Sequence, residues 1–255
     1  MIIVISPAKS LDFESDFNKQ GFTLADFKTE SEQLITAMRK KKPKAIGELM
    51  GISENLAELN YERFQNWAYP ESTENAKPAV LAFKGDVYLG LQADTFSGDE
   101  MAFAQNHLRI LSGLHGLLKP LDLIHPYRLE MGTKVTVGKH NNLYSFWGEK
   151  INKKLAESLE ESESPVLINL ASKEYFKATN PRKFTHEIIT PVFKENKGGT
   201  YKVVSFFAKK ARGMMAAYII KNKLMKPGYI KSFSEDGYTF NEALSSEKEW
   251  TFTRG

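Results

Sequence analysis

Three short polar clusters each follow an apolar run of the sequence and carry side chains that can bind or activate a ligand. They are Ser6-Pro7-Ala8-Lys9, Phe83-Lys84-Gly85-Asp86-Val87-Tyr88 and Ala171-Ser172-Lys173-Glu174-Tyr175-Phe176. Ligand-binding groups of α/β proteins lie at the carboxyl ends of parallel strands. If the apolar runs are neighbouring parallel strands, one crevice should collect the side chains of Lys9, Lys84, Asp86, Ser172 and Glu174. Ordinary turn chemistry is the alternative, because Ser172 is a good helix N-cap and Gly85-Asp86 is a good turn.

The hexapeptide Tyr127-Arg128-Leu129-Glu130-Met131-Gly132 alternates charged and apolar residues. In an extended chain this alternation puts Arg128 and Glu130 on the same side. The planar guanidinium of Arg128 would then hold a phosphate or a carboxylate through two hydrogen bonds. A structural ion pair between Arg128 and Glu130 explains the pattern equally well.

A separate basic cluster, with Lys209, Lys210 and Arg212, opens a predicted helix in a stretch without acidic residues. No Asp or Glu occurs from residue 196 to residue 234. Cations at a helix N-terminus oppose the helix dipole by about 0.3–1 kcal/mol each unless an anion joins them. We therefore favour phosphate binding by this cluster over a plain solvated face.

Two closely spaced glycines, Gly113 and Gly116, lie in an apolar segment that ends near Lys119. The segment is similar to a helix-hairpin-helix turn, in which glycine amides approach a DNA phosphate. That turn usually has one residue between its glycines, whereas this segment has two. A buried structural turn is an equally good explanation.

The composition excludes several classes of function. The chain has 255 residues and no cysteine, so a disulfide framework, an iron–sulfur cluster and a thiol peroxidase are excluded. The five histidines lack metal-ligand spacing, and no phosphate-binding loop or dinucleotide-binding motif occurs, so we predict no structural metal and assign no cofactor. No apolar run approaches the roughly 20 residues of a membrane helix, and the N-terminus does not resemble a signal peptide. We expect a cytoplasmic protein with no membrane partner.

The apolar runs and helix signals predict strands and helices that first alternate and then give way to a hairpin. Strands are predicted at residues 2–5, 79–83, 109–113 and 166–170, and residues 109–113 would also suit the last turns of the preceding helix. A hairpin is predicted from strands 187–193 and 201–207 around Gly198-Gly199. Helices are predicted at 24–42, 43–49, from Ser53 onward, and at 99–107, 145–159 and 208–224. This order is typical of a mixed α/β or α+β fold with a partly parallel mixed sheet flanked by helices. We find no internal repeat or linker and therefore expect one domain over residues 1–255.

The clusters above, with Leu111-Ser112-Gly113-Leu114, Pro120-Leu121-Asp122, Ile168-Asn169-Leu170 and Phe207-Ala208, together resemble the YaaA family of bacterial peroxide-stress proteins over nearly the whole chain. The resemblance implies a cytosolic protein that helps cells survive hydrogen peroxide, partly by limiting free intracellular iron. It also implies a single domain of unusual mixed fold, a basic cleft and a helix-hairpin-helix-like DNA-binding element. The family pattern has an aromatic residue after Leu114, where this chain has His115. If His115 contacts DNA, the affinity should depend on pH, because histidine titrates near neutrality.

These observations support two hypotheses of different classes. The first is a DNA-binding protein of the peroxide response that contacts duplex or branched DNA mainly through its phosphates. Its expected contacts are Gly113, Gly116, Lys119, Arg128, Lys209, Lys210 and Arg212, and the net charge of +4 suits such a partner. The second is an enzyme on a small anionic or nucleotide-like substrate, in a crevice lined by Lys9, Asp86, Arg128, Glu130, Ser172 and Lys209. Asp86 or Glu130 would then serve as general base.

An iron-sequestering protein is the least favoured hypothesis. The chain lacks cysteine, and its histidines do not have the spacing of metal ligands. The family resemblance brings no catalytic residues with it.

Overall fold

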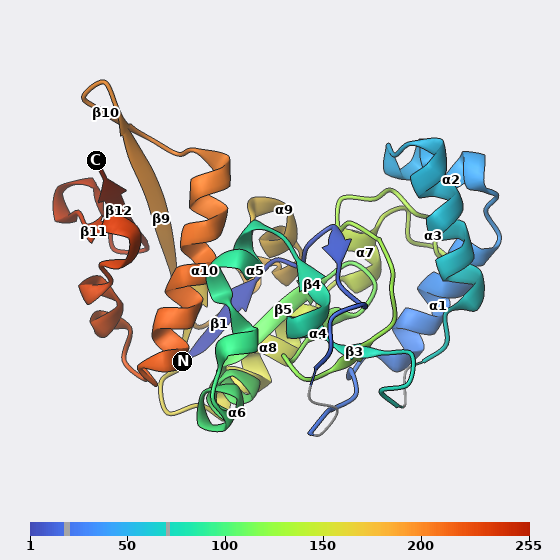
Figure 1. The fold of residues 1–255 in the computed structure, drawn as a ribbon, viewed down its shortest axis with the longest axis horizontal. Coiled ribbons are helices and arrows are strands. Elements are labelled where there is room, and N and C mark those ends of the chain that lie inside the picture. Colours follow the sequence, from blue (N-terminus) through green and yellow to red (C-terminus); the bar gives the residue numbers. More distant parts are fainter. Residues whose placement is uncertain (18–20, 70–71) are drawn as a thin grey trace.

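The computed structural model describes residues 1–17, 21–69 and 72–255, and a mixed sheet with helices on both faces forms its centre (Figure 1). The strands are β1 (Ile2–Ile5), β2 (Ser10–Leu11), β3 (Lys77–Pro78), β4 (Phe83–Lys84), β5 (Leu108–Ser112), β6 (Gly116–Leu118), β7 (Leu123–Ile124), β8 (Val166–Asn169), β9 (Glu187–Lys197), β10 (Thr200–Lys202), β11 (Thr239–Phe240) and β12 (Glu249–Arg254). The α-helices are α1 (Lys28–Arg39), α2 (Pro43–Met50), α3 (Glu54–Asn66), α4 (Ala79–Ala82), α5 (Asp86–Leu91), α6 (Gly98–His107), α7 (Leu143–Trp147), α8 (Lys150–Glu160), α9 (Lys173–Phe176) and α10 (Ser205–Lys221). Short 3-10 helices are η1 (Ala93–Thr95), η2 (Lys177–Thr179), η3 (Pro181–Lys183), η4 (Pro227–Ser232), η5 (Glu235–Gly237) and η6 (Glu242–Leu244).

The main sheet has the strand order β11-β12-β9-β8-β1-β5-β6, and β10 also pairs with β9. β1 runs parallel to β5 on one side and to β8 on the other, and the parallel pairing continues through β9 to β12. β6, β10 and β11 are antiparallel to their neighbours. The predicted mixed α/β fold with a partly parallel sheet is therefore confirmed.

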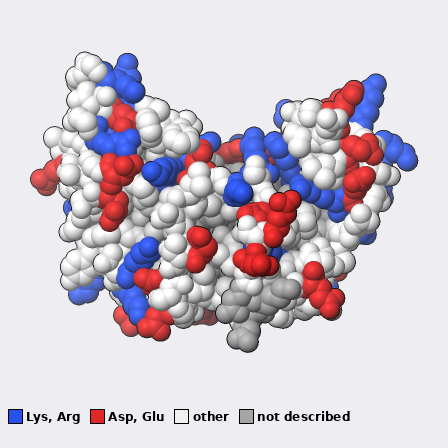
Figure 2. Space-filling model, in the orientation of Figure 1, with Lys and Arg blue, Asp and Glu red and all other residues white. Residues whose placement is uncertain are grey.

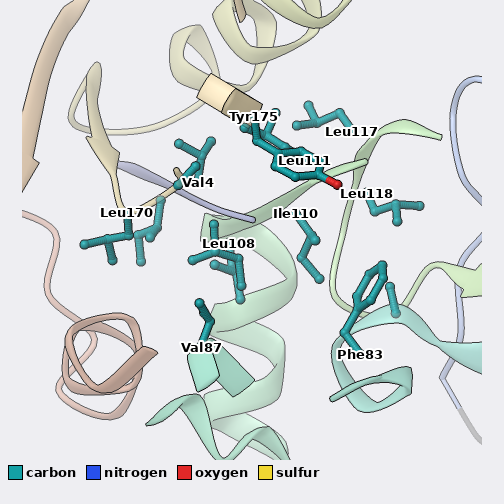
Figure 3. Packing of buried hydrophobic residues seen from close by; sticks show 14 of the residues in the cluster. Val4, Phe83, Val87, Leu108, Ile110, Leu111, Leu117, Leu118, Leu170 and Tyr175 are labelled. Atoms are coloured by element: carbon teal, nitrogen blue, oxygen red, sulfur yellow. The ribbon is translucent and has the colours of Figure 1, made fainter. Parts of the chain in front are cut away.

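The continuous apolar runs of the sequence form the buried centre of this sheet. All four residues of β1 and all four of β8 are buried, as expected of parallel strands covered on both faces. Figure 3 shows that Leu111 lies on the side of Tyr175 of α9, whereas the adjacent Ile110 points to the side of Phe83. Side chains that alternate across a strand in this way need an apolar layer on each face.

Helices α5 and α10 pack with their backbones in direct contact. A Cβ atom on Gly213 would lie 1.8 Å from the carbonyl oxygen of Val87, and one on Gly90 would lie 2.1 Å from the carbonyl oxygen of Lys210. Only residues without a side chain fit at these two positions. The contact places the start of α5, at Asp86, beside the first turns of α10.

The turn at residues 113–116 joins two strands, so the helix-hairpin-helix-like turn predicted at these residues is wrong. β5 and β6 pair antiparallel, with Ser112 opposite Gly116. Gly116 has a φ of +67° and packs against the ring of Trp147, whose Nε1 donates to the carbonyl oxygen of Gly113 at 3.1 Å. Both glycines are buried, so their amides do not reach a DNA phosphate. Apolar residues around two glycines suit a buried β-turn as well as a turn between helices.

The strand predicted at residues 79–83 is also wrong. Its first four residues form the single helical turn α4, and Phe83 begins β4, which pairs with β2 outside the main sheet. A short apolar run fits a buried helix or a buried strand equally well, and the alanines of this run favour the helix.

Two predicted helices have different limits. The helix predicted at 145–159 is interrupted at Gly148, whose φ of +52° ends α7 before α8 begins. The helix predicted at 24–42 begins only at Lys28, because Thr23 forms a bridge to Asp122 and donates its hydroxyl to that carboxylate at 2.6 Å.

His115, the departure from the family pattern, is buried in the core, so the pH-dependent DNA contact expected of it is wrong. Its Nδ1 lies 3.2 Å from the Oγ of Ser31, whose hydroxyl donates to a carbonyl oxygen of Phe27 or Leu114. Nδ1 therefore donates to Ser31, and Nε2 has no hydrogen-bond partner among the described residues. Burial lowers the pKa of His115 to about 3, with a smaller contribution from His125.

The contact between α5 and α10 predicts the effect of adding one methyl group. Gly213→Ala should lower the free energy of unfolding by about 1–3 kcal/mol, because the methyl would overlap the Val87 carbonyl and force the helices apart. Gly98→Ala is the matched control, since nothing lies within 4 Å of a Cβ at that helical position. Urea unfolding measures both variants. Equal stability of the two would contradict the close packing.

The buried His115 predicts a pH dependence of stability. Its folded pKa of about 3 lies below the unfolded value near 6.5, so below pH 6.5 the unfolded chain binds a proton that the folded chain does not. Stability is therefore lost on acidification, and His115→Phe should remove a loss on the order of 2 kcal/mol between pH 7 and pH 5. Urea unfolding at each pH compares the two proteins. Burial also lowers the pKa of His107 and His125, but both remain in the variant, so parallel pH profiles would contradict the assignment to His115.

Candidate functional site

A crevice opens where the parallel strands β1 and β8 end. Ser6 and Ser172 follow these strands and lie side by side. The Ser6 hydroxyl donates to the Oγ of Ser172 at 3.3 Å, and the Ser172 backbone N–H donates to the Oγ of Ser6 at 2.9 Å. The crevice has a volume of about 360 Å³, which is within the range of small-molecule sites.

The polar clusters predicted from the sequence meet at this crevice. Its lining includes Lys9, Lys84, Asp86, Glu130, Ser172 and Glu174. Two cations that we assigned to DNA contact, Lys209 and Arg212, line it as well. β1 and β8 bring their following residues together as parallel neighbours, whereas Lys84 arrives from β4, outside the main sheet.

Glu130 anchors one wall of the crevice through two ion pairs. Its carboxylate lies 2.8 Å from the Nζ of Lys9 and 3.1 Å from an Nη of Arg128. The structural ion pair considered for Arg128 is therefore present, yet its buried Nε has no hydrogen-bond partner among the described residues. A Cβ on Gly113 would lie 2.1 Å from the carbonyl oxygen of Leu129. The bare glycine thus lets the chain before Glu130 lie directly on the β5–β6 turn.

The opposite wall comes from α5 and α10. The carboxylate of Asp86 lies 3.7 Å from the Nζ of Lys209, which is half exposed. Arg212 is half-buried one turn further along α10 and makes no ion pair or hydrogen bond in the part of the chain that the structure describes. Burial without such a partner lowers the pKa of Arg212.

Lys84 and Glu174 also line the crevice, and each has a partner outside the pairs described above. The Nζ of Lys84 lies 3.7 Å from a carboxylate oxygen of Asp12. Glu174 accepts the backbone N–H of Gly132 at 2.9 Å, and this bond ties α9 to the segment that carries Glu130.

The structure does not bring together all the residues assigned to DNA contact. Lys119 follows β6, which runs antiparallel to β5, and therefore lies at the edge of the sheet opposite the crevice. Lys210 lies outside the crevice lining and pairs with Asp236 at 3.8 Å. The buried Gly113 and Gly116 serve packing.

Two tyrosines of the crevice had no role assigned from the sequence. The Tyr88 hydroxyl donates to the carbonyl oxygen of Ser6 at 3.2 Å, and Tyr175 lines the crevice from α9. Burial raises the pKa of both phenols well above the usual value, so they stay protonated. Both belong to polar clusters noted in the sequence, and that position was the available signal.

Figure 2 shows a hollow between two raised ends of the molecule, and α5 and α9, which contribute to the crevice lining, lie between these ends. One end is formed by β9, β10 and α10 and the other by α1, α2 and α3 (Figure 1). Figure 2 shows Lys and Arg gathered along this hollow, with fewer Asp and Glu among them.

Neither a metal centre nor a membrane span is found in the described ranges. No group of three His, Cys, Asp or Glu residues there is placed to hold a metal ion. No helix of these ranges combines the length and apolar character needed to cross a bilayer.

Comparison with known proteins decides the family. The family model described as peroxide stress protein YaaA matches residues 1–244. This chain belongs to the YaaA family. The resemblance seen in the sequence is thereby confirmed, and membership makes the chain a peroxide-stress protein by family.

Relatives match this YaaA-family chain over its full length. A protein of Saccharophagus degradans is 54% identical over 254 residues, covering 100% of this chain and 99% of the relative. One of Cellvibrio japonicus is 53% identical, covering 100% and 98%, and one of Teredinibacter turnerae is 52% identical, covering 100% and 99%. Each is called a UPF0246 protein, a name that states no activity.

The two ion pairs of Glu130 predict that removing its negative charge lowers the stability of the fold. Glu130→Gln should lower the free energy of unfolding by about 1–2 kcal/mol, because Lys9 and Arg128 lose their shared partner. The loss should shrink in about 1 M salt, which screens the ion pairs. Glu58→Gln, at an exposed position of α3, is the control and should change stability by less than about 0.5 kcal/mol. Identical urea unfolding of both variants would contradict the anchoring role.

Proposed function

We propose that this YaaA-family protein acts in the peroxide response by binding DNA through its phosphate backbone, with the hollow as contact surface. The observation that carries the proposal is the gathering of Lys and Arg along the hollow (Figure 2). A concave surface lined by cations concentrates positive potential and attracts a polyanion.

Helix α10 and strand β10, in the raised end beside the hollow, carry accessible cations for this contact. The side chains of Lys209 and Lys210 are 52% and 42% exposed, and Lys202 of the adjacent β10 is exposed. The carboxylates facing Lys209 and Lys210 are 3.7 and 3.8 Å away. Exposed ion pairs of this kind contribute only about 0–1 kcal/mol, so a DNA phosphate can replace either carboxylate as partner.

The proposed contact set is smaller than the set expected from the sequence. It keeps Lys209 and Lys210 and adds Lys202, whereas Lys119 lies at the other edge of the sheet and Gly113 and Gly116 are buried. Contacts to phosphates carry no sequence information, so binding should tolerate any sequence.

Lys210 and Lys119 form a matched pair for testing DNA binding by fluorescence anisotropy. Lys210→Glu should weaken binding of a short duplex about three- to tenfold in low salt, whereas Lys119→Glu should change it by less than about twofold. Wild-type affinity should fall steeply between about 50 and 200 mM salt. Salt-independent binding, or equal loss in the two variants, would overturn the proposal.

A second function, catalysis on a small anionic substrate, is favoured by the convergence of carboxylates and cations in the crevice. Asp86 is the better candidate for general base, because its ion pair with Lys209 is long and half exposed. Glu130 is held closely by Lys9 and Arg128. A general base must lie within hydrogen-bond reach of the proton that it removes, and Asp86 lines the crevice directly.

A further inference from the structure

We infer that the crevice binds a small organic phosphate. The guanidinium of Arg212 anchors the phosphate group, and hydroxyl or amino groups of the ligand face Asp86. The inference rests on the crevice of the second proposed function and names its ligand. It does not depend on DNA binding in the hollow.

Three of the four cations that line the crevice have a carboxylate partner. Lys9 lies 2.8 Å from Glu130, Lys84 lies 3.7 Å from Asp12, and Lys209 lies 3.7 Å from Asp86. Among the described residues, Arg212 is the crevice cation without a carboxylate or a hydrogen bond. Arg212 is therefore the one of these four crevice cations that no group of the described chain holds, and the Glu174 carboxylate of the same lining has a backbone N–H and no cation as its partner.

Arg212 lies one helical turn from a second cation of the crevice lining. Arg212 and Lys209 are three residues apart on α10, so their side chains lie on the same side of the helix, and both line the crevice. Arg212 is half-buried, and a desolvated charge without a partner costs free energy. An anion bound between Arg212 and Lys209 would offset that cost.

The chemistry of Arg212 and Lys209 favours a phosphate as the bound anion. A guanidinium donates two parallel hydrogen bonds to phosphate or carboxylate, and a second cation three residues away favours the more highly charged phosphate. A volume of about 360 Å³ accommodates a small metabolite, not a double helix.

The carboxylate of Asp86 constrains the part of the ligand beyond its phosphate group. The carboxylate of Asp86 lies in the wall beside Lys209 and would repel a bare polyanion. Carboxylates accept hydrogen bonds, so Asp86 suits a ligand body with hydroxyl or amino groups. A sugar phosphate or a nucleoside monophosphate combines both features.

The test is calorimetric titration of the full chain with ribose 5-phosphate and adenosine monophosphate, with ribose and adenosine as uncharged controls. At least one phosphate should bind with a Kd below about 1 mM, and the uncharged controls should not bind. Arg212→Gln should weaken that binding by about tenfold or more. Arg182→Gln removes an exposed arginine of η3 outside the crevice lining and should change it by less than about twofold.

A second variant and a fold control keep the result interpretable. Lys209→Gln should weaken phosphate binding about three- to tenfold, so it replaces Arg212→Gln if that variant does not fold by circular dichroism. The inference is overturned if neither phosphate binds, if Arg212→Gln binds like the wild type, or if ribose binds as well as its phosphate.

Three further measurements separate this inference from both proposed functions. Lys210→Glu should bind the phosphate like the wild type, even though its DNA binding is weakened, because Lys210 lies outside the crevice. Recovery of bound ligand unchanged by ³¹P NMR supports a binding site and counts against catalysis on that ligand. Competition of a short duplex with the phosphate, with both losses in Arg212→Gln, would assign Arg212 to the DNA backbone and overturn the inference.

Discussion

Backbone contact between α5 and α10 is the constraint on which the candidate site depends. Gly90 and Gly213 remove the two side chains that would hold these helices apart. The separation of the helices in turn sets the distance between Asp86 and Lys209. Gly113 has the same role on the opposite wall, where it admits the chain that leads to Glu130. The positions of both charged walls thus depend on close contacts between a glycine and a backbone carbonyl group.

The sequence predicted those parts of the fold that depend on local patterns. Continuous apolar runs identified β1 and β8, because strands covered on both faces need such runs. Placing polar clusters after parallel strands then followed from general sheet topology. The turn at Gly116 was misassigned, because the same apolar pattern serves a helical turn and a buried β-turn.

Other features could not be predicted, because they depend on residues far apart in the chain. Asp86 and Lys209 are paired only through the packing of α5 on α10, and Asp236 reaches Lys210 only after the chain has passed through η4. The position of Lys119 depends on the direction of β6. Local charge patterns therefore identified the basic cluster of α10 but not which of its members has a partner.

The site also bears on how a protein of this family takes part in peroxide defence. The chain has no cysteine, so it does not reduce peroxide by thiol chemistry. Its polar groups are arranged instead around a hollow and a crevice that present cations to solvent. A contribution to peroxide defence that depends on binding fits this arrangement.

The central position of β1 has a consequence for synthesis on the ribosome. This strand emerges well before its parallel partners, which begin at Leu108 and Val166. One edge of β1 therefore has no partner until about two thirds of the chain has been made. Parallel pairing over such long separations is slow to form, and an unpaired apolar strand is prone to aggregate. The nascent chain must keep Ile2–Ile5 shielded from other strands for most of its translation.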